Sequence, residues 1–301
     1  MSYRRERWEW VDGDFVDADF LENATGKATM ALLDATPLVV LFHGLEGDSR
    51  SHYSLSLMAA VRDLGWRGVV VHFRGCSGSP NRLPRAYHAG DAAEIDRVLR
   101  RLRADFPLAP IGAVGVSLGG NALLKWLGEQ GAAAQAAVNA AVAISAPVDL
   151  AAAGEALARG FNLFYTRHFL RSLKRKAAIK LDQYPGLFDW SRVAAAPTLY
   201  HFDNLVTAPL HGFNDTETYW REASSKPHLK TIALPTLLVN ARNDPFMPVS
   251  ALPSSRQVSA SVTLEFAQQG GHVGFVGGAF PGTLSWLPGR TLEFFRAILN
   301  P

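Results

Sequence analysis

A serine set among glycines is the residue of this 301-residue chain whose surroundings point most clearly to chemistry. Ser117 lies in the sequence Gly115-Val116-Ser117-Leu118-Gly119, directly after an apolar run and directly before a segment with helical periodicity. Glycines at these positions permit the sharp strand-to-helix turn that exposes a serine hydroxyl at the edge of a sheet. Because a serine hydroxyl is a poor nucleophile alone, it needs a base that takes its proton. The pattern therefore predicts a nucleophilic serine and directs the search to a base further along the chain.

A histidine and an aspartate follow the last two predicted strands. Asp244 lies in the loop after the apolar run 235–239, and His272 lies in a glycine-rich loop after the run 262–266. The order serine, acid, histidine is the chain order of α/β-hydrolases. We therefore predict that His272 is the base for Ser117 and that Asp244 is the partner of that base. Three other aspartates compete for the role of the acid, and none follows a buried strand as directly: Asp149, Asp203 and Asp215.

The negative oxygen that forms during attack on a carbonyl needs hydrogen-bond donors, and two backbone N–H groups are placed to supply them. Leu118 begins the predicted helix after the serine, so its N–H points to where the oxyanion forms. A second donor is expected after the run 37–42, where Gly44 lets the backbone approach the substrate and Leu45 carries the N–H. His43 is expected to brace this loop through its ring nitrogens, with metal binding as the alternative role.

These residues need a scaffold that brings distant loops to one edge, and the apolar pattern predicts one. Residues 8–21 are typical of an antiparallel hairpin that turns at Asp12-Gly13. Apolar runs then alternate with helical segments, as in a mostly parallel, doubly wound α/β sheet with helices on both faces. The predicted strands are 37–42, 68–73, 110–116, 140–144, 235–239 and 262–266, the last of which suits an edge. The predicted helices are 52–64, 90–104, 118–129 and 289–299.

One long stretch interrupts this alternation. Residues 148–230 contain no clear buried strand and have helical periodicity, which predicts a helical lid inserted into a core formed by 1–147 and 231–301. Within it, aromatic and basic side chains are interleaved over 161–180. A solvated helix face with its apolar side on the core is the simpler interpretation of this pattern, and weak contact with an anionic lipid surface is the alternative.

Composition fits a globular protein with a substantial core. Hydrophobic residues make up 48% and charged residues 19% of the chain, so disorder is not expected. The net charge of +3 and the isoelectric point of about 9.1 reflect a scattered excess that does not favour a nucleic-acid partner. The start of the chain lacks the pattern of a secretory signal, and no uninterrupted apolar run reaches the length of about 18 residues that spans a bilayer. A soluble, cytoplasmic protein is expected.

Two further residues follow the predicted strand 68–73. Cys76 is the single cysteine, so an intramolecular disulfide is excluded. It is expected to be a small buried side chain, with a redox-sensitive thiol as the alternative. Arg74 is expected to support the loop by hydrogen bonds to carbonyl groups or to Asp91, with binding of a substrate carboxylate as the alternative.

With these residues in place, the chain resembles α/β-hydrolases of the bacterial YheT type, which are similar to the eukaryotic ABHD lipid and ester hydrolases. The resemblance covers nearly the whole chain. It rests on the motifs Asp12–Val16, His43–Gly47, His72–Gly78, Pro80–Leu83, Tyr87-His88, Gly115–Asn121, Phe202-Asp203, His211-Gly212, Asp244–Met247 and Gly270–Phe275. It implies an α/β-hydrolase fold with a helical lid and ester hydrolysis without a metal or other cofactor. It also implies Ser117, Asp244 and His272 as nucleophile, acid and base. Family members usually carry an additional segment before Arg4, which leaves the pocket shape and oligomeric state open.

The expected function is therefore that of a serine hydrolase acting on a small-molecule carboxylic ester, with a short- to medium-chain or lipid-like acyl group. The reaction would pass through an acyl-enzyme. Two alternatives stay open at this point. The same site could serve an acyltransferase, thioesterase or amidase, or the chain could be a binding protein that kept the fold without the activity.

Overall fold

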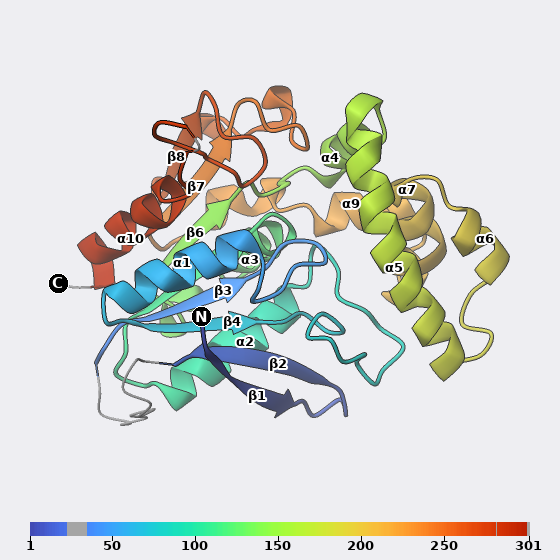
Figure 1. The fold of residues 1–301 in the computed structure, drawn as a ribbon, viewed down its shortest axis with the longest axis horizontal. Helices are drawn as coiled ribbons and strands as arrows, with labels where there is room; N and C mark the ends of the chain where they lie inside the picture. Colours follow the sequence, from blue (N-terminus) through green and yellow to red (C-terminus); the bar gives the residue numbers. More distant parts are fainter. Residues whose placement is uncertain (23–34, 281, 300–301) are drawn as a thin grey trace.

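A single twisted sheet forms the centre of the protein. The computed structural model describes residues 1–22, 35–280 and 282–299, and within them eight strands hydrogen-bond in the order β1-β2-β4-β3-β5-β6-β7-β8 (Figure 1). The strands are β1 (Tyr3–Glu9), β2 (Phe15–Leu21), β3 (Leu38–Phe42), β4 (Arg67–Val71), β5 (Ile111–Val116), β6 (Ala140–Ile144), β7 (Thr236–Ala241) and β8 (Val262–Ala267).

The six strands β3 to β8 are parallel, whereas β1 and β2 form an antiparallel hairpin whose second strand pairs antiparallel with β4. Every residue of β3, β5, β6 and β7 is buried, as expected for parallel strands covered on both faces. β8 is the outermost strand, which explains its alternating pattern. The predicted mostly parallel α/β sheet is confirmed.

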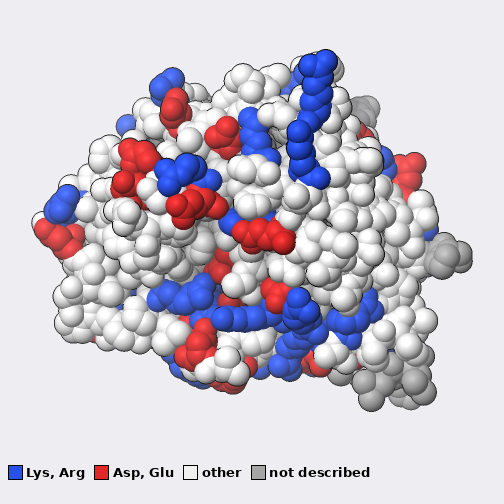
Figure 2. Space-filling view, turned by 180° about the vertical axis from the view of Figure 1, so that it is seen from behind, with Lys and Arg blue, Asp and Glu red and all other residues white. Residues whose placement is uncertain are grey.

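Two helix pairs cover the two faces of the sheet. Alternate side chains of β3 show the division, since Val40 lies in the cluster under α2 and α3, and Leu41 lies in the cluster under α1 and α10. On the face seen from behind, Lys and Arg side chains are interspersed with Asp and Glu (Figure 2). The four helices are α1 (His52–Asp63), α2 (Ala92–Asp105), α3 (Leu118–Gln130) and α10 (Trp286–Leu299).

The chain between β6 and β7 is helical throughout its regular elements. These helices gather beyond one end of the sheet, to the right in Figure 1. Several of them share a small apolar cluster of their own, which includes Leu170, Val193 and Phe202. The elements are α4 (Leu150–Leu157), η2 (Gly160–Asn162), α5 (Leu163–Gln183), α6 (Trp190–Ala195), α7 (Leu199–Phe202), the π-helical turn η3 (Asp203–Thr207), α8 (Ala208–Leu210), α9 (Thr216–Ala223) and η4 (Lys226–Thr231).

The remaining elements are short 3-10 turns: η1 (Gly131–Ala136), η5 (Val249–Ala251) and η6 (Ser255–Gln257). Among the described residues, no helix combines the length and apolar character needed to cross a lipid bilayer.

The N-terminal hairpin is longer than the sequence pattern predicts. Its first strand begins at Tyr3 instead of Trp8, because charge pairs and not apolar residues stabilise its outer part. Arg5 lies opposite Asp19 and binds it at 2.7 Å, and Arg7 lies opposite Asp17 and binds it at 2.8 Å. Cross-strand pairs of opposite charge favour this register, although the alternation of apolar and polar residues does not show it.

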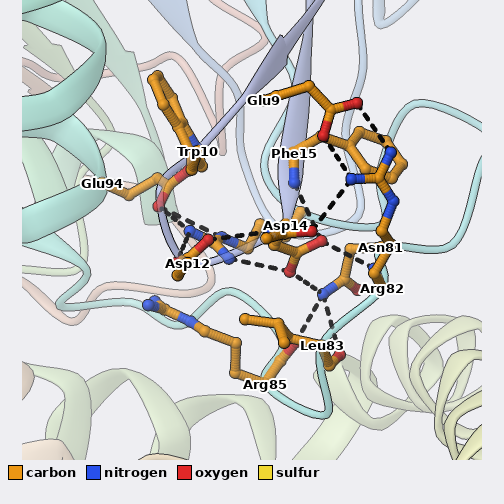
Figure 3. A network of polar contacts seen from close by, with 12 residues as sticks. Glu9, Trp10, Asp12, Asp14, Phe15, Asn81, Arg82, Leu83, Arg85 and Glu94 are labelled. Carbon is orange, nitrogen blue, oxygen red and sulfur yellow. Dashed lines mark hydrogen bonds and ion pairs between the residues drawn. The ribbon is translucent and has the colours of Figure 1, made fainter.

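A buried arginine fixes the loop after β4 to the hairpin turn and to α2. The Arg74 guanidinium is fully buried and binds Asp12 and Asp14 at 2.9 Å and Glu94 at 3.0 Å. Figure 3 shows these three acidic residues gathered at the hairpin turn. The predicted pairing of Arg74 with Asp91 is wrong, since Asp91 caps the start of α2 and pairs with Arg85. The predicted hydrogen bonds to backbone carbonyls are also wrong. Arg74 instead binds Glu94, one helical turn after Asp91, and the two aspartates of the hairpin turn.

Removing this cation should leave the buried carboxylate of Asp14 without its ion-pair partner and should leave Glu94 with only the longer ion pair to Arg97 at 3.5 Å. We expect Arg74→Met to lower the free energy of unfolding by about 3–5 kcal/mol. Arg100→Met is the matched control, because Arg100 forms an exposed pair with Asp96 and such pairs contribute about 0.3–0.5 kcal/mol. Denaturant unfolding of both variants measures the difference, and equal losses would contradict the role assigned to Arg74.

Candidate active site

The turn between β5 and α3 holds Ser117 in a strained conformation. The backbone of Ser117 has φ 52° and ψ −119°, a combination that residues with a side chain rarely adopt. Such strain persists only when surrounding contacts enforce it. Here glycines permit those contacts: a Cβ on Gly115 would lie 2.5 Å from the carbonyl oxygen of Gly119, and a Cβ on Gly119 would lie 2.4 Å from that of Phe42. The turn therefore depends on glycine at both positions.

The three residues of the predicted triad lie in one hydrogen-bonded row. The Nε2 atom of His272 is 3.0 Å from the hydroxyl oxygen of Ser117. The Nδ1 atom of His272 is 2.9 Å from one carboxylate oxygen of Asp244 and 3.1 Å from the other. These distances are within the range for proton transfer between a nucleophile and its base.

Asp244 is buried and held in place by the loop after β7. Its side chain has no exposed surface, and one of its oxygens accepts a hydrogen bond of 2.8 Å from the N–H of Phe246. The ring of Phe246 also lies against the imidazole of His272, with 4.3 Å between the ring centres. The carboxylate is therefore fixed on the side of the imidazole that faces away from Ser117.

The loop of His272 has to cross the end of β6 to reach the serine. Ser145, the residue directly after β6, accepts a hydrogen bond of 3.3 Å from the N–H of Val273 through its hydroxyl. Ser145 and Val273 both have positive φ, 49° and 66°. For a β-branched residue such as Val273 this conformation is a strained outlier, so strain is concentrated next to the base.

The loop after β3 brings a second backbone N–H next to the serine. Gly44 packs so closely that a Cβ on it would lie 3.2 Å from the Cβ of Ser117. The N–H of Gly44 donates to the hydroxyl of Tyr53, and the N–H of Glu46, two residues later, donates to the hydroxyl of Tyr87. Between them the N–H of Leu45 has no partner in the described part of the chain, and neither has the N–H of Leu118.

Both ring nitrogens of His43 are used within the protein. Nδ1 lies 2.8 Å from the carbonyl oxygen of Gly44, and Nε2 accepts a hydrogen bond of 3.0 Å from the N–H of Phe73. Burial lowers the pKa of His43 to about 3, so the ring is neutral. In the described residues, no three or more His, Cys, Asp or Glu side chains are grouped as a metal site. These contacts tie the loop after β3 to the loop after β4.

A cavity of about 120 Å³ lies over the serine, between the sheet edge and the helices of the insertion. Its walls are largely apolar and come from both parts of the chain. Leu45, Leu118 and Phe246 line it from the loops at the sheet edge, and Leu157 and Phe169 line it from the helices between β6 and β7. A ligand attached to Ser117 would thus be enclosed by the inserted helices.

The competing aspartates lie elsewhere. Asp149 and Asp215 cap the starts of α4 and α9, where each accepts a hydrogen bond from a backbone N–H. Asp203 lines the cavity wall and hydrogen-bonds to Thr207 and Trp220, not to His272. Sequence reasoning missed the contacts of Tyr53, Tyr87 and Ser145. Only Ser145 carries a usable signal, since it directly follows a predicted buried strand.

Cys76 lines a second cavity, which is distinct from the one that contains Ser117. Burial raises its pKa to about 11, so the thiol stays protonated at neutral pH. The ammonium group of Lys176, from α5, lies 3.1 Å from its sulfur and also pairs with Glu46 at 2.7 Å. A thiol in this state is a weak nucleophile.

Comparison with known proteins agrees with this architecture. Residues 37–279 match the family model described as the alpha/beta hydrolase fold. The chain belongs to the α/β-hydrolase family. It is 40% identical to the YheT protein of Escherichia coli over 98% of this chain and 85% of that protein, which confirms the resemblance seen in the sequence. It is 29% identical to mouse phospholipase ABHD3 over 100% of this chain and 73% of that one. It also matches yeast monoacylglycerol lipase at 29% identity, over 80% of this chain and 55% of that lipase.

Solved structures support the fold. The Pyrococcus furiosus esterase Pf2001 superposes with a TM-score of 0.62 at 15% identity, covering 99% of this chain and 93% of that one. At this identity the likeness concerns the architecture alone.

The close packing of Gly119 yields a prediction about stability. In Gly119→Ala the new methyl group would meet the backbone of Phe42, and we expect a loss of about 1–3 kcal/mol in the free energy of unfolding. Gly289→Ala is the control, because a Cβ there meets nothing within 4 Å in helix α10. It should gain up to about 1 kcal/mol from helix propensity. Urea unfolding tests this pair of variants, and a Gly119→Ala protein as stable as the parent would show that the turn does not require glycine.

Proposed function

We propose that this protein is a serine hydrolase that cleaves carboxylic esters through Ser117, His272 and Asp244. The general class, a carboxylic ester hydrolase, is also that of the relatives named phospholipase and monoacylglycerol lipase. The observation that carries the proposal is the continuous contact from the Ser117 hydroxyl through the imidazole to the buried carboxylate.

In the first half of the proposed reaction, His272 takes the hydroxyl proton as Ser117 attacks the ester carbon. The N–H groups of Leu45 and Leu118 stabilise the negative oxygen of the tetrahedral intermediate. Asp244 holds the imidazole in the tautomer that leaves Nε2 free to accept the proton, and it stabilises the resulting cation. His272 then gives this proton to the departing alcohol, which leaves the acyl group on the serine.

In the second half, a water molecule takes the place of the alcohol. His272 removes a proton from the water, whose oxygen attacks the acyl carbon, and the same two N–H groups stabilise the second intermediate. Its collapse breaks the bond to Ser117 and returns the proton to the serine oxygen. The products are a carboxylic acid and the free enzyme.

The inserted helices, residues 148–230, are proposed to act as a lid over the acyl group. The core of 1–147 and 231–301 supplies the reacting groups, and the lid closes an apolar cavity above them. Exclusion of bulk water strengthens the hydrogen bonds to the oxyanion. The apolar walls favour a short- to medium-chain or lipid-like acyl group.

Removal of the nucleophile or of the acid should have large and different effects. We expect Ser117→Ala to lower kcat for p-nitrophenyl esters about 10⁶-fold, and Asp244→Asn to lower it about 10⁴-fold. Ser255→Ala, in an exposed turn, is the control and should leave kcat unchanged. Steady-state kinetics over a series of acyl lengths measure all three, and near-normal turnover by Ser117→Ala would refute the mechanism.

The fate of the acyl group distinguishes hydrolysis from acyl transfer. With an added alcohol acceptor, we expect each p-nitrophenol released to be matched by one molecule of free acid. Product analysis by mass spectrometry measures this ratio. Predominant formation of the new ester would identify the protein as an acyltransferase on the same site.

A further inference from the structure

A carboxylate that the proposed mechanism does not use faces the cavity above Ser117. Asp203 and Thr207 both line this cavity, from the π-helical turn η3. Asp203 is half-buried, and it contributes to the wall of the cavity that also contains Ser117. Burial raises its pKa to about 6, so the carboxylate is mostly charged at neutral pH.

The negative charge of Asp203 has no cationic partner in the described residues. One carboxylate oxygen accepts a hydrogen bond of 2.6 Å from the hydroxyl of Thr207, and the other accepts one of 2.9 Å from the indole N–H of Trp220. Each oxygen has a further lone pair. A poorly solvated carboxylate without a counter-charge lowers stability, and groups with pKa values shifted in this way cluster at functional sites.

The surrounding lid is built to hold this carboxylate in place. The π-helical turn puts Asp203 and Thr207, four residues apart, on the cavity side, and turns of this kind are frequent at functional sites. Trp220 is held by α4, because its ring packs against Gly154 so closely that a Cβ there would lie 2.1 Å from the ring. Three elements of the lid therefore position one acceptor group.

We propose that Asp203 determines specificity by accepting a hydrogen bond from a hydroxyl or ammonium group of the ester substrate. The inference rests on the proposed ester hydrolysis, since it assigns the polar contact that the substrate makes in the same cavity. Because the cavity is lined mainly by apolar and aromatic residues, a substrate with a purely hydrocarbon chain would leave the charge of this carboxylate with only its two bonds to Thr207 and Trp220. A substrate that carries a donor at the matching distance removes that cost.

Paired substrates test the proposal. One series varies the acyl end, with p-nitrophenyl octanoate, 8-hydroxyoctanoate and 8-aminooctanoate. The other varies the alcohol end, with propyl, glyceryl and 3-(dimethylamino)propyl octanoate. We expect the wild type to prefer a donor-bearing ester over its hydrocarbon analogue by about tenfold or more in kcat/KM in at least one series.

Two variants assign this preference to the carboxylate. Asp203→Leu should abolish it, and Asp203→Asn should abolish a preference for the ammonium esters but only weaken a preference for the hydroxyl esters. Asp203→Asn should also raise Tm at about pH 8, because it removes a buried charge. Asp182→Asn, which changes an exposed carboxylate of α5 in the same lid, should leave both the preference and Tm unaltered.

Several outcomes would overturn the proposal. The wild type could show no preference in either series, or Asp203→Leu could keep the preference. A lower Tm of Asp203→Asn with unchanged preference would mean that Asp203 only anchors Trp220. Failure of the proposed function is distinguishable, because plain p-nitrophenyl octanoate would then not be turned over, or would be turned over equally by Ser117→Ala.

Discussion

The contact between the Ser117 hydroxyl and the Nε2 atom of His272 joins residues that lie 155 positions apart in the chain. The parallel sheet makes it possible, because the loops after β5, β7 and β8 all leave the same edge. Two strands, β6 and β7, separate β5 from β8, so the last loop has to cross them. The hydrogen bond from Val273 to Ser145 at the end of β6 holds that loop in its crossing position.

This crossing explains why strained residues gather around one point. Ser117, Ser145 and Val273 all have positive φ, and each such residue costs about 1–3 kcal/mol. Close packing elsewhere offsets this cost, for example the contact of Gly119 with the backbone of Phe42. The core of the protein thus stabilises an arrangement that the local sequence alone would disfavour.

The parts of the site that follow buried strands could be predicted from the sequence, because apolar runs show where strands end. This holds for the positions of Ser117, Asp244 and His272, and for the fold class. The partners of Arg74 could not be predicted, since they depend on how the hairpin turn and α2 meet in space. The part of β1 before Trp8 could not be predicted, because cross-strand charge pairs and not apolar residues stabilise it. The place of Asp203 in the cavity wall depends on the packing of several short helices, which leave a weak periodic signal.

The apolar cavity above Ser117 has two opposite energetic effects. Apolar walls exclude water and strengthen the hydrogen bonds to the oxyanion, and they also make any unpaired charge costly. Asp203 carries a charge without a cationic partner in the described residues, and the helices between β6 and β7 hold it at the cavity wall through Thr207 and Trp220. We propose that the core supplies the catalytic residues and that the inserted helices determine which ester is bound.

The central claim is that the Ser117 hydroxyl is activated for attack by His272. Labelling with a fluorophosphonate probe, followed by peptide mass spectrometry, tests it directly. The account predicts a single adduct on Ser117 in the wild type and none in Ser117→Ala. An unlabelled Ser117 in the folded wild type, or an adduct of equal yield in Ser117→Ala, would contradict it.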